Sequence, residues 1–467
     1  MPRSKQEGAR FSFAPCAQAF IQASTDPTTL LVDSATSHLM RIEHNQIRYR
    51  VIQILVGVIA MITLVAALWG SGRVALSRMM VKYAETVGDP AAADTAVGLT
   101  PSDAEAHYAR AALSNYLNQQ AAALNELELA VSLRPRDYYL WLELGLTRDE
   151  LGDPAGALFC LNESVRLAPY YAQPRWQRGN LFFRMGRYDE AFADLRQAAT
   201  SNPDLLPNFI DLAWGASRKD AQLTEQLVQV QSEKAHFALA LFFAQHGKAD
   251  EALAHFRSAG NISTENRRDL LRELLAAGAL KQAFEIWSHA SGNSLVAPGT
   301  VYDGGFEGSL NLDESGFGWR LGRTESGLNF SLDTVEPASG SRSLRIDFNG
   351  NPNPGGRLLS QLILVEPAIH YKLNFGVRTR NIVTGGPLVV TVNDAGPQRL
   401  LASSTRLPAD TGGWLTFSVE FATSPSTRAI VVSLQRESCT TSPCPIFGSV
   451  NLDNFSLEQV KGPLVKG

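Results

Sequence analysis

The sequence predicts a multidomain chain with a single transmembrane helix, then an all-α solenoid of paired helices, then an all-β sandwich. The transmembrane helix is predicted by an apolar run from Val51 to Gly72 that carries no charged residue. The solenoid is predicted by four prolines that recur every 34 residues from Pro101 to Pro203. The sandwich is predicted because the apolar period changes near Gly292 from the helical 3.6 to the strand period of 2.

Length and charge limit the function classes. The 467 residues allow about three folded regions at roughly 150 residues each. The formal net charge of -4 gives no reason to expect nucleic acid as a partner. The predicted regions are a flexible cytoplasmic tail (1–48), a transmembrane helix (49–72), a helical linker (73–97), a solenoid of five or six units (98–293) and a β-sandwich (294–467).

Residues 51–70 are predicted to contact the lipid bilayer. From Val51 to Trp69 the chain is almost wholly aliphatic, which is long enough to cross a hydrocarbon core of about 30 Å. A buried helix of a soluble domain would show a polar face at helical spacing, and this run shows none. A cleaved signal peptide is disfavoured because the run begins about 50 residues into the chain. Basic residues flank both ends, so they do not decide the orientation.

Other positions recur in phase with the prolines. Gly145 and Gly179 would let two helices approach closely, and Gly152 and Gly186 suit the left-handed residue that closes a helix. This pattern resembles the tetratricopeptide repeat (TPR) family over about residues 101–293. The first unit departs from it, because a histidine stands at position 107 where the family has an aromatic residue, and the period breaks down after Pro203.

The resemblance implies a concave face that binds extended segments of protein partners. In the family, the first helix of each unit lines this face, and aromatic and amide side chains there can hold a peptide. Alternatively, Trp176 and Trp214 pack against a neighbouring unit. No run of Lys and Arg is present, which argues against a clamp for acidic peptide ends. The predicted groove residues are Tyr108, Asn115, Tyr139, Asp149, Gln173, Trp176, Asn180, Phe183 and Trp214.

The C-terminal region is predicted to form eight or nine short strands. Its motifs resemble those of carbohydrate-binding jelly-roll modules, and they are Gly304–Gly308, Gly318–Trp319, Gly413–Trp414 and Leu452–Leu457. The resemblance implies that the first and last strands are neighbours, that Glu307 and Asp453 hold a structural calcium ion, and that polysaccharide is a potential partner. Alternatively, the two carboxylates are solvated strand ends. Both tryptophans match positions that are core in the resembled family, so we expect them to pack rather than to stack on sugar.

Cysteine spacing bears on the compartment. Cys439 and Cys444 lie five residues apart in a turn-rich stretch, where they either form a disulfide or remain free thiols. A zinc site is disfavoured because no other Cys or His pair has ligand spacing. A disulfide requires an oxidising compartment. We therefore expect a single-pass protein of a bacterial inner membrane, with its C-terminal bulk in the periplasm.

The sequence contains no nucleophile elbow, phosphate-binding loop or zinc-protease helix, so we expect no enzyme activity and no required cofactor. Histidines 236, 246 and 255 are expected to face solvent. The predicted function is a membrane-anchored scaffold in envelope or exopolysaccharide assembly. The alternative is a glycan-binding receptor. A sandwich face covered by the repeats would favour the scaffold, and a concave sheet with exposed aromatics would favour the receptor.

Overall fold

The computed structural model of the protein describes residues 30–290, 297–311, 314–322, 327–350, 356–439 and 442–460. Residues 1–29 of the predicted tail, and the predicted boundary at residue 293, lie outside the described residues. The chain divides into two compact units, Met1–Gly152 and Asp153–Gly467. Each unit is described by itself.

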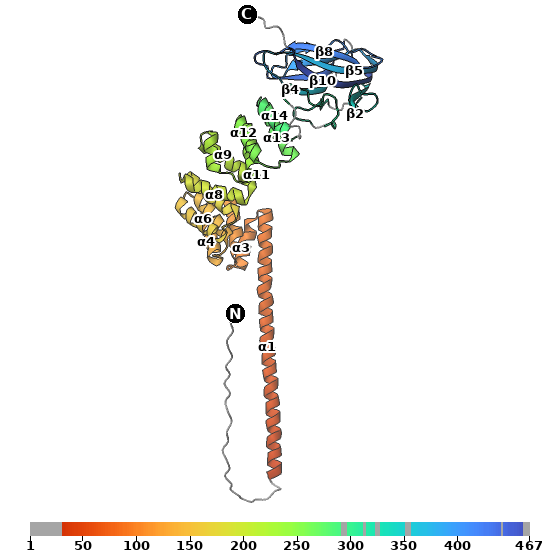
Figure 1. The fold of residues 1–467 in the computed structure, drawn as a ribbon. Coiled ribbons are helices and arrows are strands. Elements are labelled where there is room, and N and C mark those ends of the chain that lie inside the picture. The colour runs from red at the N-terminus through yellow and green to blue at the C-terminus, as the bar shows by residue number, and fades with distance from the viewer. Residues whose placement is uncertain are drawn as a thin grey trace, which may run out of the picture. The chain divides into compact units, whose positions relative to one another are not determined.

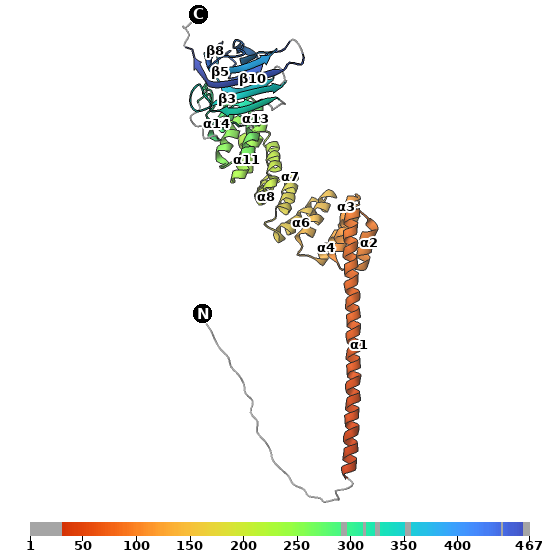
Figure 2. The ribbon, with the colours of Figure 1, turned by 90° about the vertical axis from the view of Figure 1, so that its right-hand side faces the viewer.

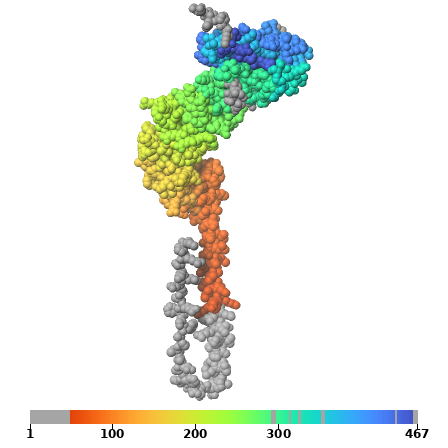
Figure 3. All heavy atoms as spheres, in the orientation of Figure 1, coloured from red at the N-terminus to blue at the C-terminus, as the bar shows by residue number. Residues whose placement is uncertain are grey.

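The first helix, α1, runs from Leu30 to Val87. It begins earlier than expected, because residues 30–48 are helical rather than a flexible tail. This stretch contains no proline or glycine, so nothing interrupts a helix that extends from the apolar run. From Arg48 onward α1 is long and apolar enough to cross a membrane. Its apolar side chains between residues 51 and 69 are exposed (Figure 3).

The segment predicted as a helical linker folds back on itself. Helix α2, Pro90–Leu99, packs against the end of α1. Ser77 Oγ of α1 donates a hydrogen bond to the carbonyl oxygen of Ala96 at 3.0 Å, and Ser77 is fully buried. Ala84 and Ala93 are also fully buried. Small residues therefore allow this close pair of helices, which precedes the first repeat.

Paired helices follow in the order expected of a solenoid (Figure 1). In the first unit they are α3 (Ala104–Tyr116), α4 (Gln120–Leu133) and α5 (Tyr138–Glu150). In the second unit they are α6 (Pro154–Leu167), α7 (Ala172–Arg184), α8 (Tyr188–Ser201), α9 (Leu206–Ala216), α10 (Ala221–Val228), α11 (Glu233–Gln245), α12 (Ala249–Ser258), α13 (Thr264–Ala276) and α14 (Leu280–Ala290), with a short 3-10 turn at Pro203–Leu205.

Prolines and glycines end these helices at the repeat spacing. Pro169 follows the end of α6 by two residues, because proline cannot continue a helix. Gly152 and Gly186 have φ angles of 77° and 76°, in the left-handed region that glycine adopts without strain. A Cβ on Gly179 of α7 would lie 2.8 Å from the Leu195 side chain of α8. The close approach of α7 and α8 therefore requires glycine.

One repeat position carries a hydrogen bond that the sequence did not reveal. In three successive units, a side-chain nitrogen donates to the carbonyl oxygen of the repeat proline six residues earlier. The histidine at position 107, which stands in place of the expected aromatic residue, donates this hydrogen bond in the first unit. Trp141 is half-buried, and its indole nitrogen reaches this carbonyl. The distances are 2.9 Å from His107 to Pro101, 3.0 Å from Trp141 to Pro135, and 3.0 Å from Arg175 to Pro169.

The C-terminal region is a sandwich of two antiparallel five-stranded sheets, with orders β1-β4-β9-β6-β7 and β2-β3-β10-β5-β8 (Figure 2). Alternate side chains such as Leu344, Ile346 and Phe348 point into the core between the sheets. The strands are β1 (Arg320–Leu321), β2 (Leu328–Asp333), β3 (Ser343–Gly350), β4 (Arg357–Leu364), β5 (His370–Thr384), β6 (Leu388–Asp394), β7 (Leu400–Ser403), β8 (Leu415–Ala422), β9 (Ala429–Arg436) and β10 (Ile446–Gln459).

The first and last strands are not neighbours, contrary to expectation. Strand β1 pairs with β4, and β10 lies in the other sheet between β3 and β5. The opening motif at residues 304–308 is irregular, yet it lies against β10, where the backbone N–H of Phe455 donates to the Gly304 carbonyl at 2.9 Å. The motif therefore contacts the last strand through a turn rather than through strand pairing.

Helix α14 contacts the β domain within the second unit. Trp287 is 5% exposed and packs edge-on against Tyr302, with ring centroids 5.0 Å apart. Its Nε1 donates to Glu314 Oε1 at 3.1 Å. Phe284 of the same helix packs against Phe317 at 5.0 Å. We call these five residues the helix–sheet junction.

Candidate functional site: partner-binding faces and the outer sheet

Predicted groove residues of the first unit form a polar cluster on α3 and α5. The hydroxyl groups of Tyr108 and Tyr139 lie 3.1 Å apart. Asn115 donates from Nδ2 to Thr147 Oγ1 at 3.0 Å, whereas its Oδ1 is buried without a donor in the described part of the chain. Asp149 is half-buried on the same helix as Tyr139. The cluster thus contains a buried carbonyl acceptor that is not hydrogen-bonded within the described residues.

Glu143, which the sequence analysis did not select, lies in the same cluster. Burial raises the pKa of its carboxyl above the usual range, although a hydrogen bond from Tyr139 opposes this. Burial and the Tyr139 hydroxyl also raise the pKa of Tyr108. These groups accept hydrogen bonds or hold protons, so the cluster is suited to the N–H groups of an extended chain. A carboxylate four residues after a predicted groove tyrosine was the signal available in the sequence.

In the second unit the predicted groove residues separate into two groups. Gln173 is exposed on α7, Trp176 and Asn180 are half-buried, and the Asn180 amide donates to the Trp176 carbonyl at 2.9 Å. Phe183 is half-buried and packs against the helical core. The prediction that Trp214 lines the groove is wrong. It is 6% exposed and packs against aromatic residues of α11, so it belongs to the core rather than to a binding face.

A buried carboxylate that the sequence analysis did not select lies between α7 and α8. Asp194 is 4% exposed. It accepts hydrogen bonds from Arg178 at 2.6 and 2.8 Å and from Arg175 at 3.1 Å. Glu126 plays the same part in the first unit, where it pairs with Arg110 and with a histidine on α3. The signal was the 68-residue spacing, two repeat periods, between Glu126 and Asp194 and between the two partner arginines.

Two of the three histidines expected to face solvent do not. The Nδ1 atoms of His236 and His255 lie 2.9 Å apart, and His255 is 9% exposed. The Nε2 atom of His255 contacts Glu225 at 3.1 Å. Burial and the neighbouring His255 lower the pKa of His236. Among the described residues no group of three or more His, Cys, Asp or Glu side chains is arranged to hold a metal ion.

The two predicted calcium ligands bind backbone groups of one loop. Asp453 is fully buried, so it is not a solvated strand end. Its Oδ2 accepts from the N–H groups of Ala338 at 2.9 Å and Ser339 at 3.2 Å, and its Oδ1 accepts from Asn454 at 2.7 Å. Burial raises the pKa of Asp453, those N–H groups oppose the rise, and the charge of Glu307 adds to it.

Glu307 completes this contact from the opening motif. Its Oε1 accepts from the N–H groups of Ser341 at 2.7 Å and Arg342 at 3.2 Å, and its Oε2 accepts from the Ser341 hydroxyl. These hydrogen bonds lower the pKa of Glu307. All four oxygens of the two carboxylates are thus bound to residues 338–342 or to the next residue of β10. The two carboxylates therefore hold residues 338–342 in place directly. Calcium takes six to eight oxygen ligands, and the two carboxylates would supply only part of that number.

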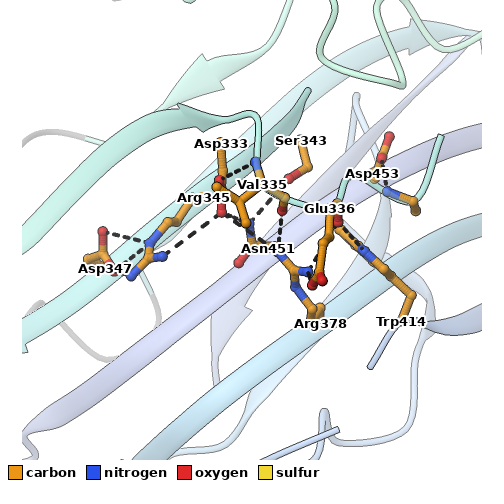
Figure 4. Close-up of polar contacts among 11 residues, drawn as sticks. Asp333, Val335, Glu336, Ser343, Arg345, Asp347, Arg378, Trp414, Asn451 and Asp453 are labelled. Atoms are coloured by element: carbon orange, nitrogen blue, oxygen red, sulfur yellow. Dashed lines mark hydrogen bonds and ion pairs between the residues drawn. The ribbon is translucent and has the colours of Figure 1, made fainter. Parts of the chain in front are cut away.

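A buried arginine organises the outer face of the second sheet. Arg378 is 4% exposed and donates to the carbonyl oxygens of Val335 at 3.0 Å and Glu336 at 3.1 Å (Figure 4). It also lies 3.7 Å from Asp333 and 5.0 Å from the Trp414 ring centroid. Its Nε is buried with no partner in the described part of the chain. The sequence offered no signal for this residue beyond its place in an alternating strand.

Asp333 links this arginine to the next strands. Its Oδ1 accepts from the Val335 N–H at 2.8 Å, and its Oδ2 accepts from the Asn451 amide at 2.9 Å (Figure 4). Burial works to raise the pKa of Asp333, but these hydrogen bonds and the charges of Arg345 and Arg378 hold it below its usual range. Asp333 therefore connects β2 with Arg378 of β5 and Asn451 of β10.

A cavity of about 300 Å³ lies beside this network. Its lining includes Arg380, Asn381, Asp410 and the half-buried Trp414. In the described part of the chain, the Arg380 guanidinium and the Asn381 amide form no hydrogen bond or ion pair. A cation, an amide, a carboxylate and an indole around a small cavity can bind a hydroxyl-bearing ligand.

The two tryptophans of the β domain differ. Trp319 is 7% exposed, donates to the Asp303 carbonyl at 3.0 Å and packs against Phe306 and Phe455. It is a core residue. Trp414 is only half-buried and donates to the Glu336 carbonyl at 2.8 Å, so the expectation of a core position holds only in part for it.

The paired cysteines lie at the end of the sandwich. The structure joins Cys439 and Cys444 in a disulfide, with their Cα atoms 6.1 Å apart. The buried guanidinium of Arg436 donates to the Cys444 carbonyl at 2.9 Å and contacts its sulfur at 2.8 Å. Cys160 of the helical region is buried and is not part of this disulfide, and Cys16 lies outside the described residues.

Comparison with known proteins identifies one repeat. The tetratricopeptide repeat model matches residues 172–205, which comprise α7, α8 and the proline that follows. Protein FlbA of Caulobacter vibrioides is 31% identical over 101 residues, which are 22% of this chain and 17% of that protein. The chain thus covers less than a fifth of that relative.

The solved structures that the comparison returned include a crystal structure of MamA, at 17% identity over 38% of this chain and 91% of that chain, with a TM-score of 0.27. The pilF protein of Pseudomonas aeruginosa is 14% identical over 50% of this chain and 94% of that chain, with a TM-score of 0.28. The family match covers one helix pair, and the helices before it, α3 to α6, share its helix lengths and closing prolines. The chain therefore contains a tetratricopeptide repeat at residues 172–205, and its C-terminal β domain has two five-stranded sheets.

Proposed function

We propose that this protein is a membrane-anchored, non-catalytic scaffold that binds other proteins on the periplasmic side of a bacterial inner membrane, in envelope or exopolysaccharide assembly. The observation that carries the proposal is the set of half-buried polar side chains on first helices, in which Asn115 keeps a carbonyl oxygen without a donor. A buried acceptor of this kind costs about 1–3 kcal/mol while unpaired. A bound peptide N–H would remove that cost.

Three further observations support the membrane and compartment assignments. Helix α1 exposes a run of apolar side chains that a bilayer would cover. The Cys439–Cys444 disulfide suits an oxidising compartment. Leu362 and Leu364 of β4 pack against the helical core, so the repeats cover part of the first sheet. Coverage of this kind favours an architectural role for the β domain.

Site-specific crosslinking tests the scaffold. A photoreactive phenylalanine at Gln173, exposed on first helix α7, is expected to capture envelope proteins in intact cells. The matched control carries the same group at Phe159, which is 58% exposed on second helix α6. Equal capture at both positions, or capture at neither, would contradict the proposal. A phosphatase reporter after Gly467 should be active, and an inactive reporter would overturn the periplasmic assignment.

A glycan-binding receptor is the second candidate, and the cavity beside Trp414 favours it. The resemblance of the β domain to a carbohydrate-binding module rests on the motifs at the two ends of the domain. On this reading, the full-length protein should bind a polysaccharide array, and Trp414→Ala should reduce binding by about tenfold, or 1.4 kcal/mol. The control is Phe447→Ala, which removes an aromatic ring that is 47% exposed outside the cavity.

The glycan experiment is repeated with a chelator of divalent ions. This repeat distinguishes a calcium site at the two carboxylates from a direct anchor of the loop. If calcium bridges Glu307 and Asp453, removal of divalent ions should lower both glycan binding and thermal stability. If the carboxylates act only through the N–H groups of residues 338–342, the chelator should change neither. Absence of binding to every glycan tested, with and without calcium, would eliminate the receptor candidate.

A further inference from the structure

We propose a second peptide-binding site in the repeat region, in the cavity beside helix α10, for an extended acidic segment of a partner protein. This inference rests on the proposed scaffold function. It adds a site formed by second helix α8, the beginning of α9 and residues 228–235, away from the predicted groove residues. The cavity has a volume of about 800 Å³.

The cavity exists because α10 is short. It has 8 residues, whereas α6 and α8, the second helices of the two preceding pairs, have 14 each. Gln229 ends α10 in the left-handed conformation, with φ of 49°. The chain then runs without regular structure to Ser232, which caps α11. The space that further helical turns would fill is left open.

The segment that borders the cavity offers free backbone groups. The N–H groups of Val230 and Gln231 make no backbone hydrogen bond within the described part of the chain. Gln231 is exposed and Val230 is half-buried. An extended peptide can pair with such groups in the way that a strand adds to a sheet edge. A helical ligand could not, because its own N–H and carbonyl groups are already paired.

The charged and apolar groups that line the cavity indicate the composition of the ligand. The floor contains the buried side chains of Leu206, Phe209 and Val228. Arg196 at the cavity wall donates to the carbonyl oxygens of Leu227 at 2.9 Å and Val228 at 3.3 Å, and it has no carboxylate partner in the described part of the chain. The cavity therefore presents an uncompensated cation above an apolar floor.

The remaining charged groups of the lining reinforce this preference. Lys234 is exposed and forms no ion pair within the described ranges. Glu233 is the one carboxylate in the lining, and a Cβ on Gly260 would lie 2.6 Å from it, so its carboxyl group sits against the α12–α13 turn. Successive side chains of an extended peptide point to opposite faces. A segment of alternating apolar and acidic residues would thus place one set on the floor and the other against Arg196 and Lys234.

Fluorescence anisotropy with the full-length protein in detergent tests this site. The probes are a labelled heptapeptide of alternating glutamate and valine and its counterpart of alternating lysine and valine. The acidic peptide is expected to bind at least about tenfold more tightly than the basic one. Ala193→Trp should weaken acidic-peptide binding by at least about tenfold, because Ala193 is exposed and lines the cavity, so the indole would fill it.

The matched control is Ala254→Trp, at an exposed position of second helix α12 outside the cavity, and it should leave binding unchanged. Equal binding of the two peptides, binding of neither, or binding unaffected by Ala193→Trp would overturn the proposal. Crosslinking from Gln173 and acidic-peptide binding, both measured without the Ala193→Trp substitution, separate the two sites. If Gln173 captures envelope proteins while the acidic peptide fails to bind, only the second site is wrong. If the acidic peptide binds while capture at Gln173 fails, the first-helix face is wrong.

Discussion

Trp287→Ala is expected to lower the free energy of unfolding of the second unit by about 3–5 kcal/mol, the range for removal of a buried large aromatic side chain. The indole is 5% exposed and contacts Tyr302 and Phe317 across the helix–sheet junction. Its loss would leave a cavity there and would remove the donor to Glu314. Urea unfolding of the full-length protein in detergent, followed by circular dichroism, measures the change.

Two further variants separate packing from hydrogen bonding at the junction. Trp287→Phe keeps a ring but loses the indole N–H, so it should cost less than the alanine variant. Phe447→Ala removes an aromatic side chain that is 47% exposed, and it should change stability by less than about 0.5 kcal/mol. If Trp287→Ala were no more destabilising than Phe447→Ala, the junction would not hold the two regions together.

Asp453→Asn is expected to destabilise the β domain by about 1–3 kcal/mol, the cost of leaving buried polar groups unsatisfied. The substitution preserves shape but replaces one carboxylate oxygen with an amide nitrogen. Both oxygens now accept backbone N–H groups, from Ala338 and Ser339 on one side and from Asn454 on the other. In either orientation the new amide would direct its hydrogens at a donor. Thermal unfolding of the full-length protein would report the loss.

Asp410→Asn is the matched control, because Asp410 is exposed in the same domain and accepts one backbone N–H, from Gly412. It should leave the thermal midpoint nearly unchanged. A wild-type midpoint for Asp453→Asn would mean that the carboxylate does not anchor residues 338–342. A chelator that destabilised the wild type and not the variant would indicate calcium instead of the direct anchor.

The helical region illustrates what the repeat spacing could predict. Prolines at the 34-residue period each follow a helix end, and Gly179 lies where a Cβ would collide with Leu195 of α8. These predictions succeed because a proline or a glycine acts through its own backbone. The role of residue 107 could not be predicted in that way. A histidine, a tryptophan and an arginine share only a donor nitrogen within reach of a carbonyl, and this becomes visible when the turn is folded.

Side-chain burial was harder to predict than helix position. Trp214 was assigned to the binding face by counting along the repeat, yet it lies in the core. Helix α9 still begins 34 residues after α7, so Trp214 takes the repeat position of Asn180, but aromatic residues of α11 pack against it. The cavity beside α10 arises because that helix ends early, at Val228. Arg378 likewise gave no signal, because its partners Val335 and Trp414 come from distant segments.

The sequence by itself determined the order of the parts: an apolar helix, paired helices at a regular period, and alternating strands. Each of these follows from local patterns, in which period, charge and chain-breaking residues act within a few turns or one strand. Only the tertiary structure decided which polar atoms remain unpaired, which carboxylates anchor a loop and where a cavity opens. Those properties depend on contacts between residues far apart in the chain, and a buried donor or acceptor is satisfied or left open only when the elements pack.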